Sequence, residues 1–236
     1  MPFSTPSSSY PLGTDFLGRD VLSRVLWGGR TAIGLGLLAT IIAYGIGTTI
    51  GLVAGFTRSL VDPLLMRSMD VLLAFPPLLF LLVLATGAGA SAAVAVLGVA
   101  VIQIPGIARV IRAATQDVSV RGYVEAAIAR GETNRFVLAR EVLPNIVSTV
   151  AADAGLRLTG SILLIASLNF LGLGLQPPVA DWALMIAENR GGLTFQAWAV
   201  AVPAIMIGVL TVGVNLLADA IARSMGRSAD TEALKR

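Results

Sequence analysis

Side chains that catalyse reactions or bind metals are scarce in this sequence. It contains no histidine and no cysteine, so imidazole bases, thiolate nucleophiles, disulfides and the commonest metal ligands are absent. The Walker A pattern of ATP-binding proteins needs a lysine inside a glycine-rich loop, and the single lysine, Lys235, lies beside the C-terminus. No cofactor or metal site is therefore expected in this chain.

One charged pair interrupts an otherwise apolar segment. Asp153 and Arg157 are four residues apart, and acid before base at this spacing stabilises a helix. Charges inside a membrane-spanning helix mark a functional site by default. The alternative is that the pair lies near the end of its helix and only neutralises itself. That alternative is favoured by the position of Asp153, about two helical turns beyond Pro144.

The longest polar region, 109–145, carries a second pattern. A short amphipathic helix is expected to end at Gly131, a residue favoured just after the last helical turn. A second helical stretch, 133–142, is followed by Leu143-Pro144, and proline does not continue a helix interior. Helix, glycine turn, helix and proline predict a protruding knob. An ordinary solvated loop is the alternative.

The composition places these residues in a membrane protein. Hydrophobic residues make up 56% of the 236 and charged residues only 13%, with a mean hydropathy of +0.83. A soluble domain has about 25% charged residues, so an ordinary globular enzyme and a disordered tail are both excluded. At about 20 residues per spanning helix, this length allows about four to seven spans.

Five apolar segments are long enough to be membrane-spanning helices. Strands are not expected, because the segments are too long and do not alternate. The spans are expected at about 31–56, 64–85, 92–111, 146–170 and 197–218. Pro76-Pro77, Pro105 and Pro203 fall within spans and should kink them. The predicted fold class is therefore all-α, a polytopic transmembrane bundle of about five spans.

Small and aromatic residues predict how these helices pack. Gly47, Gly51 and Gly55 give two successive small-xxx-small steps, a close-packing pattern of membrane helices. We expect a packing face there, against either a neighbouring helix or a partner subunit. Trp182 and Trp198 flank the last span, where an aromatic belt at the membrane surface would place them.

The arginines predict the orientation, because cytoplasmic connections carry an excess of Lys and Arg. The 109–145 connection holds Arg109, Arg112, Arg121, Arg130, Arg135 and Arg140. With this connection in the cytoplasm, the other cytoplasmic cations are Arg58, Arg67, Arg223, Arg227, Lys235 and Arg236, and the extracytoplasmic ones are Arg19, Arg24, Arg30 and Arg190. The N-terminus is then extracytoplasmic and the C-terminus cytoplasmic. The net charge of +3 is accounted for by arginines placed as the positive-inside rule requires. No nucleic-acid partner is therefore expected.

The polar loop resembles the EAA loop of bacterial ABC importer permeases, whose pattern is E-A-A-x3-G-x9-I-x-L-P. The matching residues are Glu125-Ala126-Ala127, Gly131 and Leu143-Pro144, with Glu141 in place of the isoleucine. Two further stretches resemble the C-type permeases of dipeptide, oligopeptide and nickel importers. One runs Gly13-Thr14-Asp15-Phe16-Leu17-Gly18-Arg19-Asp20, and the other Gly172-Leu173-Gly174-Leu175-Gln176-Pro177-Pro178. The resemblance covers about 11–226, nearly the whole chain.

This resemblance implies a mechanism. The loop would dock as a coupling helix into a cleft of a separate cytoplasmic ATPase, which would hold ATP and Mg²⁺. Glu125 would make a polar contact, Ala126 and Ala127 would permit close approach, and Gly131 would set the turn. Possible partners of acidic groups on the ATPase are Arg121, Arg130 and Arg135, with simple positive-inside topology as the alternative. Closure of the ATPase would then rock the bundle between inward-open and outward-open states.

The resemblance also implies partners and a domain plan in the bacterial inner membrane. The partners are a second, B-type permease subunit, two ATPase subunits or domains, an extracytoplasmic substrate-binding protein and the lipid bilayer. The domains are an extracytoplasmic segment 1–30, a permease domain 31–218 that includes the loop 109–145, and a cytoplasmic tail 219–236. Members usually have six spans, the first before the G-T-D segment. That span is missing here, through a misassigned start or a short variant.

Peptide import is the expected function, with no enzymatic activity in the chain itself. The alternative is the same architecture importing nickel or another small solute, because the external binding protein largely sets specificity. Functions of other classes are a non-transporting membrane scaffold and an intramembrane enzyme. The enzyme is disfavoured because the chain lacks histidine and Asp153 has no second aspartate facing it from a neighbouring span.

Overall fold

The computed structural model describes residues 1–57 and 59–233, with side chains up to residue 224. The cations Arg58, Lys235 and Arg236 lie outside the described residues, as does the side chain of Arg227. Helices and loops account for the described part, and its single β-type pairing is an isolated bridge between Thr14 and Asp20. The all-α prediction is confirmed.

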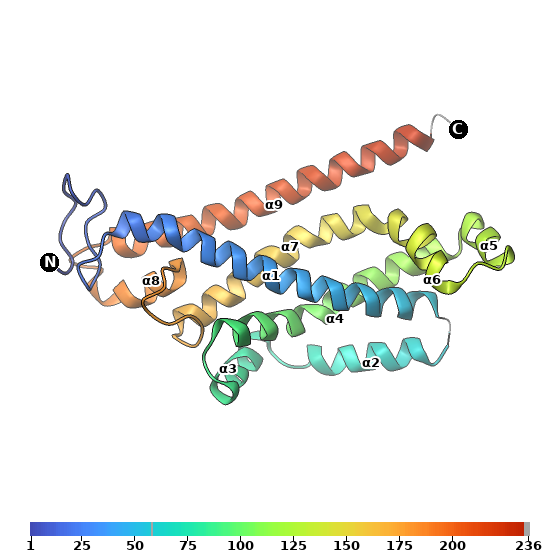
Figure 1. Ribbon diagram of the computed structural model, residues 1–236, viewed down its shortest axis with the longest axis horizontal. Coiled ribbons are helices and arrows are strands. Elements are labelled where there is room, and N and C mark those ends of the chain that lie inside the picture. Colours follow the sequence, from blue (N-terminus) through green and yellow to red (C-terminus); the bar gives the residue numbers. More distant parts are fainter. Residues whose placement is uncertain (58, 234–236) are drawn as a thin grey trace. The chain divides into compact units, whose positions relative to one another are not determined.

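The long helices correspond to the predicted spans (Figure 1). The elements are α1 Val21–Phe56, α2 Val61–Leu73, α3 Pro77–Ala88, α4 Ala92–Ser119, α5 Gly122–Ala129, α6 Asn134–Phe136, a π-helical segment Val137–Val142, α7 Leu143–Phe170, α8 Trp182–Asn189, a 3-10 turn Arg190–Gly192 and α9 Trp198–Ala233. Four of the described helices are long and apolar enough to cross a membrane, and α2 with α3 would make a fifth span. This agrees with the expectation of about five spans.

The kink expected at Pro76-Pro77 in the second span is confirmed. The helix breaks between α2 and α3, where Pro76 has an extended conformation with ψ of 126°. A residue that precedes a proline is held in this conformation by the proline ring, and Pro77 then begins α3, where its missing N–H costs nothing. Pro105 and Pro203, in contrast, remain inside α4 and α9.

Two helices extend beyond the spans expected from the sequence. Helix α1 begins at Val21 rather than near residue 31, and α4 continues to Ser119 rather than ending near 111. In these extensions Arg24 pairs with Asp15 at 2.8 Å, and Arg112 pairs with Asp62 at 2.6 Å. A paired arginine is less costly to remove from water, so a charge in the sequence did not mark the end of the helix.

The chain forms two compact units, whose boundary falls within α1, α4, α7 and α9. Unit 1 contains Met1–Ala39, Pro76–Val99 and Leu158–Val214, and unit 2 contains Thr40–Phe75, Ala100–Arg157 and Asn215–Arg236. In unit 1, Trp182 is 4% exposed, and its Nε1 donates a hydrogen bond to the Val25 carbonyl at 2.7 Å. The expectation that Trp182 belongs to a surface belt is wrong, because it fills the core beside Gly28 and Gly29.

In unit 2, α1 and α4 pack closely along a row of glycines. A Cβ at Gly51 would lie 2.7 Å from the Ala108 carbonyl oxygen, and one at Gly55 would lie 2.7 Å from the Arg112 carbonyl oxygen. A Cβ at Gly47 would lie 2.8 Å from Ile107 Cγ2. The packing partner is therefore a neighbouring helix of the same chain, one of the two alternatives expected from the sequence.

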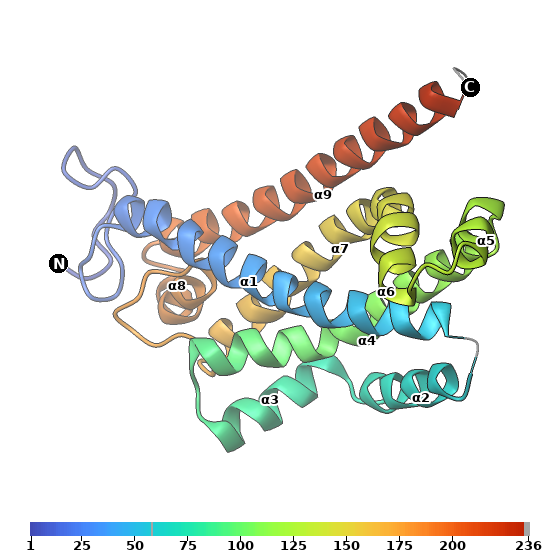
Figure 2. The same ribbon diagram turned by 45° about the vertical axis from the view of Figure 1, so that its right-hand side comes forward.

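Helix α2 is attached to the same part of α4 by two ion pairs. Arg112 pairs with Asp62, and Arg109 pairs with Asp70. Because the later α4 residue pairs with the earlier α2 residue, the two helices run antiparallel. Figure 2 shows α2 alongside this half of α4.

Candidate functional site

The motif-bearing loop lies in unit 2, beyond the C-terminal end of α4 (Figure 1). Helix α5 ends in two backbone hydrogen bonds: the Gly131 N–H donates to Ile128 at 2.9 Å, and the Glu132 N–H donates to Ala127 at 3.2 Å. This Schellman arrangement needs a left-handed residue after the helix, and Gly131 has a φ of +83°. No heavy atom lies within 4 Å of the place where its Cβ would be. The glycine is therefore required for its backbone conformation and not for space.

The two faces of α5 have different surroundings. Val124 and Ala127 are fully buried, in the same core as Val137. Glu125 and Ala126 are exposed on the other side of the helix. The expectation that Ala127 approaches a partner is wrong, because its small side chain lets α5 pack against its own chain. Of the three E-A-A residues, Glu125 and Ala126 remain accessible.

The expectation that Leu143-Pro144 stops the second helix of the loop is also wrong. Thr133 caps this helix, since its Oγ1 accepts a hydrogen bond from the Phe136 N–H at 3.4 Å. The helical path then continues through Val137–Val142 into α7. Pro144 has no N–H to donate inside this continuous helix, and the preceding π-helical turn accommodates the irregular hydrogen bonding.

Three arginines surround this loop. Arg121, Arg130 and Arg135 are exposed, and within the described part of the chain none of them forms an ion pair. A hollow beside the loop is lined by Phe56, Ser119, Glu125, Ile128 and Asn134. An exposed acidic side chain, a hollow with apolar residues and unpaired cations are together suited to docking another protein.

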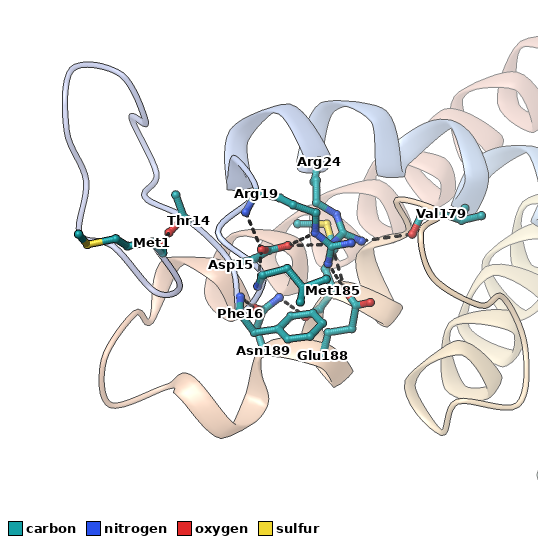
Figure 3. Close-up of polar contacts among 11 residues, drawn as sticks. Met1, Thr14, Asp15, Phe16, Arg19, Arg24, Val179, Met185, Glu188 and Asn189 are labelled. Carbon is teal, nitrogen blue, oxygen red and sulfur yellow. Dashed lines mark hydrogen bonds and ion pairs between the residues drawn. The ribbon is translucent and has the colours of Figure 1, made fainter.

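The G-T-D segment forms a separate ion-pair cluster in unit 1 (Figure 3). Asp15 is fully buried, and its carboxylate pairs with Arg19 at 2.7 Å and with Arg24 at 2.8 Å. Glu188 of α8 pairs with both arginines at 3.0 Å. Glu188 was missed from the sequence because it is 169 residues from Arg19 and carries no local pattern. The cluster ties the N-terminal segment and α1 to α8.

Electrostatics and turn geometry point to a structural role for this cluster. Burial raises the pKa of Glu188, Arg19 lowers it and Asp15 raises it again. The other signature residues build the turn before α1: Gly13 and Gly18 have φ of +71° and +77°. Thr14 donates a hydrogen bond from Oγ1 to the Met1 carbonyl at 2.6 Å, and Asp20 accepts one from the Ser23 N–H at 2.9 Å.

The second signature segment forms the turn that ends α7. Gly172 has a φ of +74°, and the Leu173 N–H donates to the Leu168 carbonyl at 3.0 Å, as in a Schellman motif. Gly174 leaves room for the Asn169 side chain, and Gln176 donates from Nε2 to the Gly172 carbonyl at 3.0 Å. Pro177 follows in the same loop, joined to Pro178 by a cis peptide bond. These residues shape a turn.

Asp153 and Arg157 form the expected ion pair, at 3.1 Å. The pair lies inside α7, which runs from Leu143 to Phe170. Tyr44, which sequence reasoning missed, donates a hydrogen bond to Asp153 at 2.7 Å. Among the described residues, no group of three or more His, Cys, Asp or Glu side chains is placed to hold a metal ion.

Comparison with known proteins identifies the family. The family model described as "Binding-protein-dependent transport system inner membrane component" matches residues 47–227. The glutathione transport system permease protein GsiD of Pectobacterium atrosepticum is 37% identical over 216 residues, which cover 92% of this chain and 72% of that protein. The di/tripeptide transport system permease protein DppC of Pseudomonas aeruginosa is 36% identical over 210 residues, covering 89% of this chain and 69% of that protein.

Solved structures share the fold. The MetNI methionine ABC transporter in an inward-facing conformation contains a chain with a TM-score of 0.70 and 16% identity, covering 86% of this chain and 95% of that one. A chain of an amino acid ABC transporter has a TM-score of 0.67 and 19% identity, covering 86% and 94%. The chain therefore belongs to the inner-membrane permeases of ABC importers, in the peptide family, and is a transport subunit rather than an enzyme.

Proposed function

We propose that this chain forms half of the translocation path of an importer of short peptides, and that α5 couples the path to a separate ATPase. The observation that carries the coupling role is the geometry of the loop. Its inward face, with Val124 and Ala127, is anchored in the core of unit 2, while Glu125 and Ala126 are exposed. A rigidly anchored helix with an accessible face transmits a push from a docked partner to the helices on both sides of it.

The partners follow from this arrangement. An ATPase subunit, which binds ATP and Mg²⁺, docks on α5 and faces the arginines Arg121, Arg130 and Arg135. A second permease subunit completes the path, and an extracytoplasmic binding protein delivers the solute. The loop and the C-terminus are cytoplasmic, as the distribution of arginines favours. Peptides are the proposed solutes because similar permeases are named for glutathione and for di- and tripeptides.

Single cysteines test the docking surface, because the chain has no native cysteine. Ala126→Cys, on the exposed face of α5, should cross-link to the ATPase through a short thiol-reactive linker in the assembled complex. Ala113→Cys is the matched control, since Ala113 is also exposed but lies on α4. Equal cross-linking of both variants, or of neither, would remove α5 as the docking element.

Uptake by proteoliposomes tests the solute. The complete importer with its binding protein should accumulate a labelled dipeptide or glutathione and should not accumulate Ni²⁺. Uptake of Ni²⁺ in place of peptide would refute the peptide assignment while leaving the coupling role intact.

A further inference from the structure

Three helices of unit 2 enclose one polar cluster. Arg157 and Asp153 lie on α7, Tyr44 on α1, and Gln103 and Gly106 on α4. The Asp153 carboxylate accepts hydrogen bonds from the Tyr44 hydroxyl at 2.7 Å and from Arg157 Nε at 3.1 Å. Gln103 Nε2 donates a hydrogen bond to the Arg157 carbonyl at 2.6 Å. This cluster is unrelated to the α5 loop and to the ion pairs around Asp15.

The cluster lies halfway along two helices of equal length. Arg157 and Gly106 are near the midpoints of α7 and α4, each of which has 28 residues. At 1.5 Å per residue, this midpoint is about 20 Å from either end of the helix. Arg157 lies inside the predicted span 146–170, and a charge inside a span needs a functional or structural reason.

The guanidinium is held with most of its donors unused. Nε points to Asp153, but within the described part of the chain Nη1 and Nη2 donate no hydrogen bond. The group packs on Gly106, where a Cβ would lie 2.8 Å from Arg157 Cζ. The Arg157 side chain is 22% exposed, and one side of the guanidinium, including both Nη atoms, lies within 3 Å of the place where a Gly106 Cβ would be. A planar fork of N–H donors with free outer positions matches a carboxylate.

The surface beside the cluster differs from a lipid-facing surface. Most exposed residues of α7 up to the cluster are small or polar, among them Asn145, Ser148, Thr149 and Ala152, and the apolar ones are Pro144, Val147 and Leu156. The exposed residues of α9 include many large apolar ones, namely Ile205, Val209, Val212, Leu216 and Leu217. Lipid tails accommodate the second composition, whereas polar side chains at membrane depth face a water-filled cavity or other protein.

We propose that Arg157 is a transient binding site for the carboxylate of the peptide in transit, the C-terminal carboxylate being the group that all short peptides share. This inference rests on the proposed peptide function. Asp153 balances the charge of Arg157 without using its outer nitrogens, so the site binds an anion without adding a net charge to the path. A transport site must release its solute, and a neutralised guanidinium holds a carboxylate more weakly than a bare one.

The test compares two labelled solutes in proteoliposomes that contain the complete importer: L-alanyl-L-alanine and its C-terminal amide. Rates are measured at saturating binding protein and expressed per loaded binding protein, so that delivery does not enter the comparison. Arg157→Gln should lower dipeptide uptake about tenfold, the scale of one lost charge-assisted hydrogen bond, and leave the amide unchanged. Arg157→Lys, which keeps the charge and loses the fork, should be intermediate and remains informative if the glutamine variant fails to assemble.

Arg109→Gln is the matched control, because it removes an arginine of the same unit outside the cluster and should change both solutes alike. An equal loss for dipeptide and amide in Arg157→Gln would show that Arg157 only supports the fold, and would overturn the site. Unchanged dipeptide uptake would overturn it as well. If the wild-type importer moved neither solute, the peptide function itself would fail, and this outcome is distinct from the other two.

Discussion

The turn that ends α5 gives the sharpest prediction for the coupling role. No atom lies within 4 Å of a Cβ built on Gly131, and its φ is +83°. A substitution there therefore meets no steric obstacle, and its cost is the left-handed conformation alone, about 1–2 kcal/mol for a residue with a Cβ. The free-energy cost of Gly131→Val should be at or above this range because the valine side chain is β-branched. The cost of Gly131→Asn should be lower because asparagine tolerates the left-handed conformation.

A loss of 1–2 kcal/mol changes a local equilibrium by a factor of about 5 to 30. If the cap must be intact for α5 to transmit movement, Gly131→Val should raise the number of ATP molecules hydrolysed per peptide imported by up to this factor. The assay measures ATP hydrolysis and peptide uptake together in proteoliposomes containing the complete importer.

Gly122→Ala is the matched control, because Gly122 begins the same helix, has the same open surroundings and lacks a positive φ. The expected order of coupling is wild type and Gly122→Ala first, then Gly131→Asn, then Gly131→Val. If Gly131→Val coupled as well as Gly122→Ala, the turn geometry would be irrelevant to coupling. If Gly131→Asn were as poor as Gly131→Val, backbone conformation would not be the cause.

Three further predictions concern the scaffold. Gly51→Ala should be less stable than Gly45→Ala by about 1–3 kcal/mol, the cost of overpacking. A Cβ at Gly51 would lie within 3 Å of a backbone oxygen, whereas one at Gly45 would meet no atom within 4 Å. Thermal denaturation of the purified complex measures the difference. Burial raises the pKa of Glu188, so the folded state favours the protonated carboxyl. The resulting stabilisation of the fold is complete below the pKa of an unfolded glutamate and is lost as the pH rises through the raised pKa of Glu188. Hydrogen exchange in α8, corrected for intrinsic rates, should therefore increase from acid to neutral pH in the wild type, and Glu188→Gln should remove that dependence. Trp182→Phe should cost about 1 kcal/mol through the lost hydrogen bond to Val25, and an unchanged melting temperature would contradict this.

Local patterns predicted several features correctly. The apolar segments gave the long helices, the glycine after α5 gave its end, and the spacing of Gly47, Gly51 and Gly55 gave a close-packed face. Each of these depends on neighbouring residues or on one helical period, so the information lies within a short stretch of sequence.

The errors have a common cause. The spans were expected at 31–56 and 92–111, but the helices continue beyond them through Arg24 and Arg112, which are paired with carboxylates on other segments. Trp182 was expected at a membrane surface and instead fills the core against Gly28. In both cases the deciding contact joins residues distant in the chain, which no local pattern encodes.

The sequence by itself determined that this chain is a helical membrane protein, a member of the importer permeases, with a motif-bearing loop that has no catalytic chemistry of its own. Only the tertiary structure decided which side of that loop is available, because burial of Ala127 and exposure of Ala126 depend on the helix packed beneath them. It also brought Tyr44 and Gly106 to the charged pair on α7. Composition and periodicity set which segments leave water, whereas long-range packing sets which side chains meet.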